Sequence, residues 1–283
     1  MRECQYNENR DFLRKAELAL RELFVRAKRV DELNFAASLS PEFRPYRQNS
    51  AVDAQYAFSD YASFLSRDVE SDIRPRVALA FYAHLAEASG FWEVVKNLIG
   101  VAQGEKFNVM PFAEFTAKYG ASEASPIPNA NKLMRSLVRR STEAGFADLG
   151  STFAAAFDAD LRNAFAHADY CLAKEGVFVL SRYGQERVVP WQELNVLLER
   201  AMVLYLSLND IRVEYCKSYV EPQHVVGTLN SREPPTSWKI EFKAPEGTMV
   251  LFNGRAMLQF GSFPNLSILA PSELNQSLSR RVC

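Results

Sequence analysis

The chain has few of the side chains that build redox or metal chemistry. Its 283 residues include only 4 cysteines and 3 histidines. The cysteines are scattered, and no two have the C-x-x-C spacing that is typical of redox and zinc motifs. A disulfide framework is not expected in a chain this long and this poor in cysteine. The sequence therefore predicts free thiols, no metal site and no cofactor.

Long apolar runs and an excess of one charge are also missing. The most apolar stretch, residues 77–102, contains His84, Glu87, Glu93 and Lys96, and these exclude a membrane span. The first residues lack the apolar segment of a secretory signal, so we expect a cytoplasmic protein without membrane contact. With 33 basic and 34 acidic residues, the net charge is −1. That balance argues against a positively charged coat for duplex nucleic acid and leaves room for a local basic site.

What is present is helical periodicity over the first three quarters of the chain. Apolar residues recur at helical spacing in residues 8–39, 52–67, 76–101, 130–144, 147–168 and 190–217. The proline-bearing segments 40–50 and 119–131 predict loops. After Tyr170 the period shortens, and residues 176–191 are typical of two strands around a turn at Tyr183-Gly184-Gln185.

The C-terminal part has a strand-like pattern. Residues 236–263 predict a three-stranded meander, because Asn253-Gly254 between apolar runs is a strong hairpin signal. The fold class is therefore mainly α, with a β-hairpin insertion and a small C-terminal antiparallel β meander. We divide the chain into an N-terminal helical extension (1–70), a helical domain (71–222) and a C-terminal β extension (223–283).

Residues 158–170, DADLRNAFAHADY, carry the most informative polar pattern. Apolar residues at i+4 spacing predict one buried helix stripe: Leu149, Phe153, Phe157, Leu161 and Phe165. Asp160, Asn163 and His167 share a different face. On an ideal helix Arg162 lies about 140° from His167. The two side chains can therefore act together only if Arg162 reaches round, if the helix ends near the motif, or if a second subunit contributes.

The run from Arg162 through Asn163 to His167 resembles the motif of the HEPN superfamily, the higher eukaryotes and prokaryotes nucleotide-binding domains. The resemblance implies a HEPN-like helical bundle. For the family members that are ribonucleases it also implies metal-independent cleavage of RNA by homodimers with paired active sites. His167 would be the general acid or base, Arg162 would stabilise the transition-state charge, and Asn163 would orient the ring or hold a phosphate oxygen.

One position departs from the family pattern. Some HEPN toxins carry a tyrosine two residues after the histidine, which a partner nucleotidyltransferase antitoxin modifies. Here Tyr170 follows His167 by three residues. The sequence therefore departs from the pattern of the modified tyrosine. An antitoxin or regulatory protein, in a defence or stress system, is the further partner that the resemblance implies.

Further residues are candidates for substrate binding. Lys132, Arg135 and Arg139, together with Arg140, form one basic helix face that could follow a phosphate backbone, although a plain solvated face is the simpler alternative. Tyr170 could stack on a base or could pack internally. Asp160 could assist catalysis or could form an ion pair or cap. The simpler alternative for Arg162 is an ion pair with Asp158 or Asp160.

The sequence thus predicts a metal-independent endoribonuclease that acts by attack of a 2′-hydroxyl on the adjacent phosphate. The main alternative is a non-catalytic HEPN-like module that binds a nucleotide or a protein partner. A third alternative is a helical scaffold in which the motif is accidental.

Overall fold

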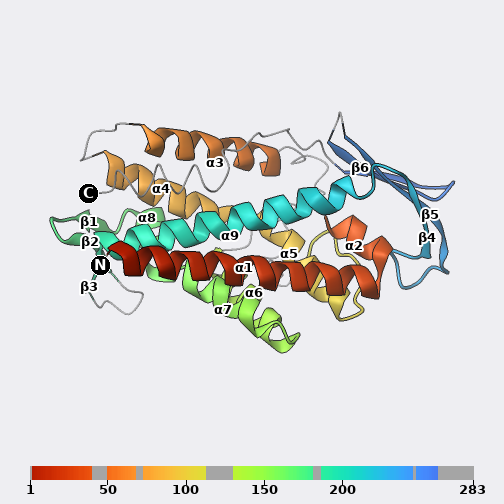
Figure 1. Cartoon of the computed structure of the whole chain (residues 1–283), viewed down its shortest axis with the longest axis horizontal. Helices are drawn as coiled ribbons and strands as arrows, with labels where there is room; N and C mark the ends of the chain where they lie inside the picture. The colour runs from red at the N-terminus through yellow and green to blue at the C-terminus, as the bar shows by residue number, and fades with distance from the viewer. Residues whose placement is uncertain are drawn as a thin grey trace, which may run out of the picture.

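A computed structural model describes residues 2–39, 50–67, 73–112, 130–180, 186–244 and 247–260. This part of the chain is mostly helical with two small antiparallel sheets, which confirms the mainly α class. Helix α1 (Arg2–Val30) packs along α9 (Trp191–Lys217), and the two sheets lie at opposite ends of the molecule (Figure 1).

The core is centred on α5 (Ser89–Ala102), whose residues from Gly90 to Ala102 are all buried. Trp92 packs edge-on against the rings of Phe91, Phe153 and Tyr205, and its indole N–H donates to the carbonyl of Leu85. Helix α1 packs on α5, α7 (Ala147–Ala156) and α9. The N-terminal helix therefore shares this core, while the division into three parts stays a prediction about independent folding.

Two helices predicted as continuous are each broken by an aspartate. Residues 8–39 form α1 and α2 (Glu32–Ser38), and residues 147–168 form α7 and α8 (Ala159–His167). The side chain of Asp31 accepts from the backbone N–H of Asn34, and that of Asp158 accepts from the N–H of Leu161. Such caps start a new helix without interrupting the apolar pattern, so periodicity alone did not show the breaks.

The prediction of one continuous helix for residues 76–101 is also wrong. It consists of α4 (Arg74–Glu87) and α5, separated by Ala88, whose ψ of 57° lies outside the helical region. No side chain caps the start of α5. The sequence pattern is apolar on both sides of Ala88, and the break therefore had no signal beyond the following Ser89-Gly90.

The other helices confirm the predictions closely. They are α3 (Ser50–Ser66), α6 (Ala130–Glu143) and α9, which Pro190 precedes. The predicted loops lie outside the described residues, except that Ser50 begins α3 and that Ala130 and Asn131 begin α6. The turn at residues 183–185 also lies outside them.

Each sheet has one strand more than the sequence predicted. The first has the order β1 (Tyr170–Leu172), β2 (Gly176–Leu180) and β3 (Glu186–Pro190). In it, Gly176 is required because a Cβ there would lie 2.1 Å from the carbonyl oxygen of Val189. The second has the order β4 (Gln223–Gly227), β5 (Thr236–Lys243), β6 (Thr248–Phe252) and β7 (Met257–Phe260).

The second sheet follows the alternation of its sequence. Trp238, Ile240 and Phe242 are buried on one face of β5, as the period of two predicts. The hairpin at Asn253-Gly254 is confirmed, and Gly254 has a φ of 81° that favours glycine. This sheet packs on α2, at the end of the molecule opposite the motif helix α8 (Figure 1).

Candidate functional site

The start of α8 is fixed by the side chain of Asp158. One carboxylate oxygen accepts from the N–H of Leu161 at 2.8 Å, and the other pairs with Arg187 of β3 at 2.7 Å. The hydroxyl of Tyr82, from α4, accepts from the N–H of Asp158 and donates to the carbonyl of Ala156 at 3.3 Å. The motif helix is thereby held to both α4 and the small sheet.

The end of α8 is a tight left-handed turn. Ala168 has a φ of 58° and is the one described residue other than glycine with positive φ. Its N–H donates to Phe165, and the N–H of Asp169 donates to Ala164 at 2.8 Å, which is the Schellman pattern. A left-handed alanine costs about 1–2 kcal/mol. This turn makes His167 the last helical residue.

Arg162 lies inside the protein rather than in an open cleft. Only 8% of the residue is exposed, and its guanidinium forms an ion pair with Glu87, the last residue of α4. Burial lowers the pKa of the guanidinium, which still stays charged near neutral pH. Arg162 thus forms an ion pair, as the simpler alternative predicted. Its partner is Glu87, however, and not Asp158 or Asp160.

Asn163 connects this ion pair to another helix. Its carbonyl oxygen accepts from Nη1 of Arg162 at 3.0 Å and from Nδ2 of Asn131 in α6 at 2.7 Å. A guanidinium only donates, so the amide atom that faces it must be the oxygen. The NH₂ group of Asn163 therefore points the other way, and it has no acceptor within the described part of the chain.

His167 is exposed, and it follows Asn163 by one helical turn on the same side of α8. It makes no hydrogen bond or ion pair with the residues that the structure describes. Arg162 is directed into the protein, toward Glu87. Within one protomer the structure therefore brings His167 and Asn163 to one face and does not bring Arg162 to it.

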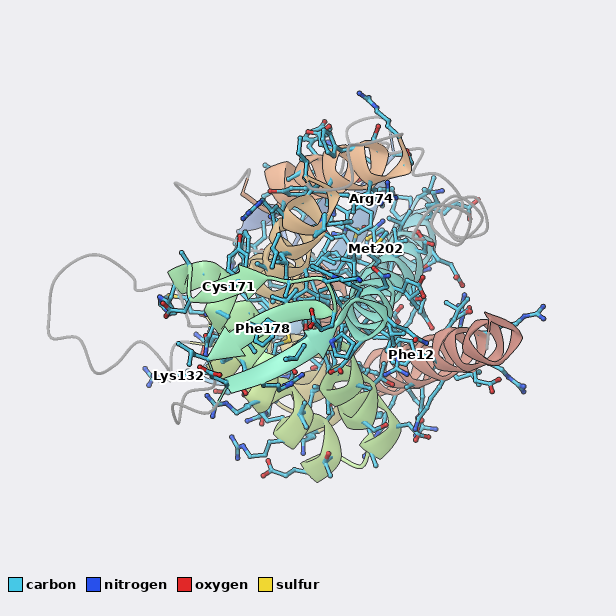
Figure 2. The ribbon with its side chains drawn as sticks, turned by 90° about the vertical axis from the view of Figure 1, so that its left-hand side faces the viewer. Phe12, Arg74, Lys132, Cys171, Phe178 and Met202 are labelled. Atoms are coloured by element: carbon cyan, nitrogen blue, oxygen red, sulfur yellow. The ribbon has the colours of Figure 1, made fainter. Side chains whose placement is uncertain are left out.

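The basic face of α6 divides into two halves. Lys132 and Arg135 are exposed, and no carboxylate in the described ranges pairs with either; Arg135 donates to the backbone oxygen of Asn131 at 3.1 Å. In the end view of Figure 2, Lys132 appears to the left of Phe178 and below Cys171, which belong to the small sheet.

The other half of the face is neutralised by acids. Arg139 pairs with Glu143 at 3.2 Å, and Arg140 pairs with Glu105 at 2.7 Å. The hydrogen bond from Asn131 to Asn163 ties the start of α6, the half that carries the exposed Lys132 and Arg135, to the motif helix. Arg139 lies further along α6 and has a carboxylate partner.

The remaining candidates have simpler surroundings. Tyr170 opens β1, its ring lies 5.8 Å from that of Phe165, and its hydroxyl accepts from Arg76 at 3.5 Å. These contacts favour the packing role over base stacking. Asp160 is half-buried and makes no hydrogen bond or ion pair among the described residues.

Two residues of this site were not found from the sequence. Glu87 lies 75 residues before Arg162, and nothing in its local pattern distinguishes it from a solvated acid of α4. Asn131 directly precedes the basic residue Lys132, but a lone asparagine at the start of a helix is more often read as a cap. Only tertiary contacts identify both.

Comparison with protein-family models, with curated proteins and with solved structures finds no match to this chain. No helix in the described ranges is both long and apolar enough to cross a membrane. Among the same residues, no group of three or more histidine, cysteine, aspartate or glutamate side chains is arranged to hold a metal ion. A function must therefore be inferred from the geometry of α8 and α6.

Proposed function

We propose that the protein is a metal-independent endoribonuclease of HEPN type, with its site on α8 and the first turns of α6. The observation that carries this proposal is the hydrogen bond between Asn131 and Asn163. It links the start of α6, which carries the cations Lys132 and Arg135, to Asn163, which lies on the same face of α8 as His167. An imidazole can transfer the protons of phosphodiester cleavage, and cations can hold the phosphate backbone.

The chemistry follows from these groups. The imidazole of His167 accepts the proton of the attacking 2′-hydroxyl or donates one to the leaving 5′-oxygen. The NH₂ group of Asn163 donates to a phosphate oxygen, and Lys132 and Arg135 hold the neighbouring backbone. A positioned acid or base contributes typically about 10²–10⁴-fold to the rate.

Both an acid and a base are needed, and the described face of one protomer offers one imidazole. A second copy of the chain would supply the other. On the small sheet beside α8, Leu180 is 52% exposed and Val188 is 38% exposed, and we expect this sheet to be where the second copy binds. Exposed apolar side chains of this kind are typical of protein interfaces when they gather on one surface.

A non-catalytic module is the second candidate, and the pairing of Arg162 with Glu87 favours it. In this arrangement the charge of the guanidinium is neutralised within the protomer and does not meet a phosphate. Such a protein would bind RNA, a nucleotide or a protein partner without turnover.

The experiment is cleavage of single-stranded RNA in the presence of EDTA, with analysis of the product ends. We expect products with a 2′,3′-cyclic phosphate, and a loss of at least about 100-fold for His167→Ala. His224→Ala is the matched control, because His224 is also exposed but lies on β4 at the other end of the molecule. If RNA binds without being cleaved, the non-catalytic candidate is correct.

The binding surface has its own test. We expect Lys132→Gln and Arg135→Gln each to weaken RNA binding and to reduce its dependence on salt, because each removes one phosphate contact. Arg139→Gln should change binding less, since that side chain is already paired with Glu143. Equal effects at all three positions would contradict the proposed surface.

A further inference from the structure

The ion pair between Glu87 and Arg162 joins the end of α4 to the middle of α8. Glu87 is the last residue of α4, where a negative charge is unfavourable for the helix dipole. Its side chain is 39% exposed, whereas that of Arg162 is 10% exposed. The carboxylate of Glu87 therefore lies at the boundary with solvent, and its negative charge balances the positive charge of the more deeply buried guanidinium.

Because Glu87 holds the guanidinium of Arg162 in place, it also affects the neighbouring residue Asn163. Nη2 faces Glu87, and Nη1 donates to the carbonyl oxygen of Asn163 at 3.0 Å. The group is planar and its donors have fixed directions. Holding one nitrogen against Glu87 therefore fixes where the other nitrogen points.

The amide of Asn163 is consequently held in one orientation. Its oxygen receives donors from both Arg162 and Asn131. A rotation of the amide by half a turn would place its NH₂ group against the guanidinium, so that two donors would face each other and lose their acceptor. The observed orientation leaves the NH₂ group directed away from Arg162 and Asn131, on a residue that shares a face of α8 with His167.

We propose that Glu87 is a positioning residue: acting through Arg162, it fixes the amide of Asn163 so that its NH₂ group donates to the substrate phosphate beside His167. This inference rests on the proposed endoribonuclease function. It makes Arg162 a positioning residue as well, and it assigns the binding of phosphate charge to Lys132 and Arg135 rather than to Arg162.

The kinetic test uses Glu87→Gln, Glu87→Ala and Asn163→Ala, with Glu175→Ala as control, because Glu175 is exposed in the turn between β1 and β2. We expect Glu87→Ala to lower kcat by about tenfold with little change in KM, and the isosteric Glu87→Gln to have a smaller effect. The double variant Glu87→Ala/Asn163→Ala should be no slower than Asn163→Ala alone, since both act through one amide.

The kinetic test distinguishes the positioning role of Glu87 from an inhibitory one. If Arg162 binds phosphate and Glu87 competes with that phosphate, Glu87→Ala lowers KM or raises kcat. Either change would overturn the proposal. Additive losses in the double variant would overturn it too, because they would show that Glu87 acts independently of Asn163.

A second measurement does not depend on activity. In protein labelled with ¹⁵N at asparagine, the side-chain NH₂ signals of Asn163 are assigned by their loss in Asn163→Asp. We expect Glu87→Gln and Glu87→Ala to shift these signals and Glu175→Ala to leave them in place. Unchanged signals in folded Glu87 variants would overturn the positioning role. Equal cleavage by wild type and His167→Ala would instead refute the proposed function, whatever the signals show.

Discussion

The left-handed turn after His167 provides a quantitative test of the geometry at the end of α8. Ala168 has a φ of 58° and a ψ of 26° and is exposed. An L-residue pays about 1–2 kcal/mol for this conformation, and glycine does not. Glycine also gains about 0.4–1 kcal/mol more conformational freedom in the unfolded chain. Ala168→Gly should therefore stabilise the protein by about 0.5–1 kcal/mol.

Ala166 is a matched control because it is exposed and lies two residues earlier, inside the same helix. Ala166→Gly should destabilise the protein by about 1 kcal/mol, since glycine is unfavourable in a helix interior. Urea unfolding followed by circular dichroism measures both values, with an unchanged m-value as the condition for comparison. A loss of stability in Ala168→Gly, equal in sign to that of Ala166→Gly, would refute the left-handed turn.

Two further predictions concern residues around α8. Asp158→Ala should cost about 2 kcal/mol, because it removes both the cap on Leu161 and the ion pair with Arg187, whereas Asp158→Asn keeps the cap and should cost less than about 1 kcal/mol. Equal costs in thermal unfolding would contradict this division. Burial raises the pKa of the Cys216 thiol to about 12, so iodoacetamide at pH 8 should label the exposed Cys171 and spare Cys216 in the folded protein. Mass spectrometry of the peptides shows whether Cys216 reacts.

The sequence predicted where helices lie better than where they end. Regular apolar spacing located α3, α6 and α9, because burial of one helix face determines which residues are apolar. It did not locate the breaks at Asp31 and Asp158, since a capping side chain changes the backbone direction without changing that spacing. The short strand β1 was missed because it has only three residues. They follow the end of α8 and form a strand by pairing with β2.

The candidate site was predictable in its residues and not in their contacts. Asn163 and His167 share one face of α8, as their spacing of four residues predicted. The partner of Arg162 was not predictable, because Glu87 arrives from another helix 75 residues earlier in the chain. The same holds for Asn131, whose hydrogen bond to Asn163 depends on how α6 and α8 meet. Local spacing constrains a helix face, whereas only packing determines what lies opposite to it.

Cleavage of RNA in EDTA by wild type and by His167→Ala tests the central claim most directly. We expect products with cyclic phosphate ends from the wild type, a loss of at least about 100-fold in His167→Ala, and wild-type activity in His224→Ala. Equal rates for wild type and His167→Ala, or activity that appears only when a metal ion is added, would contradict it.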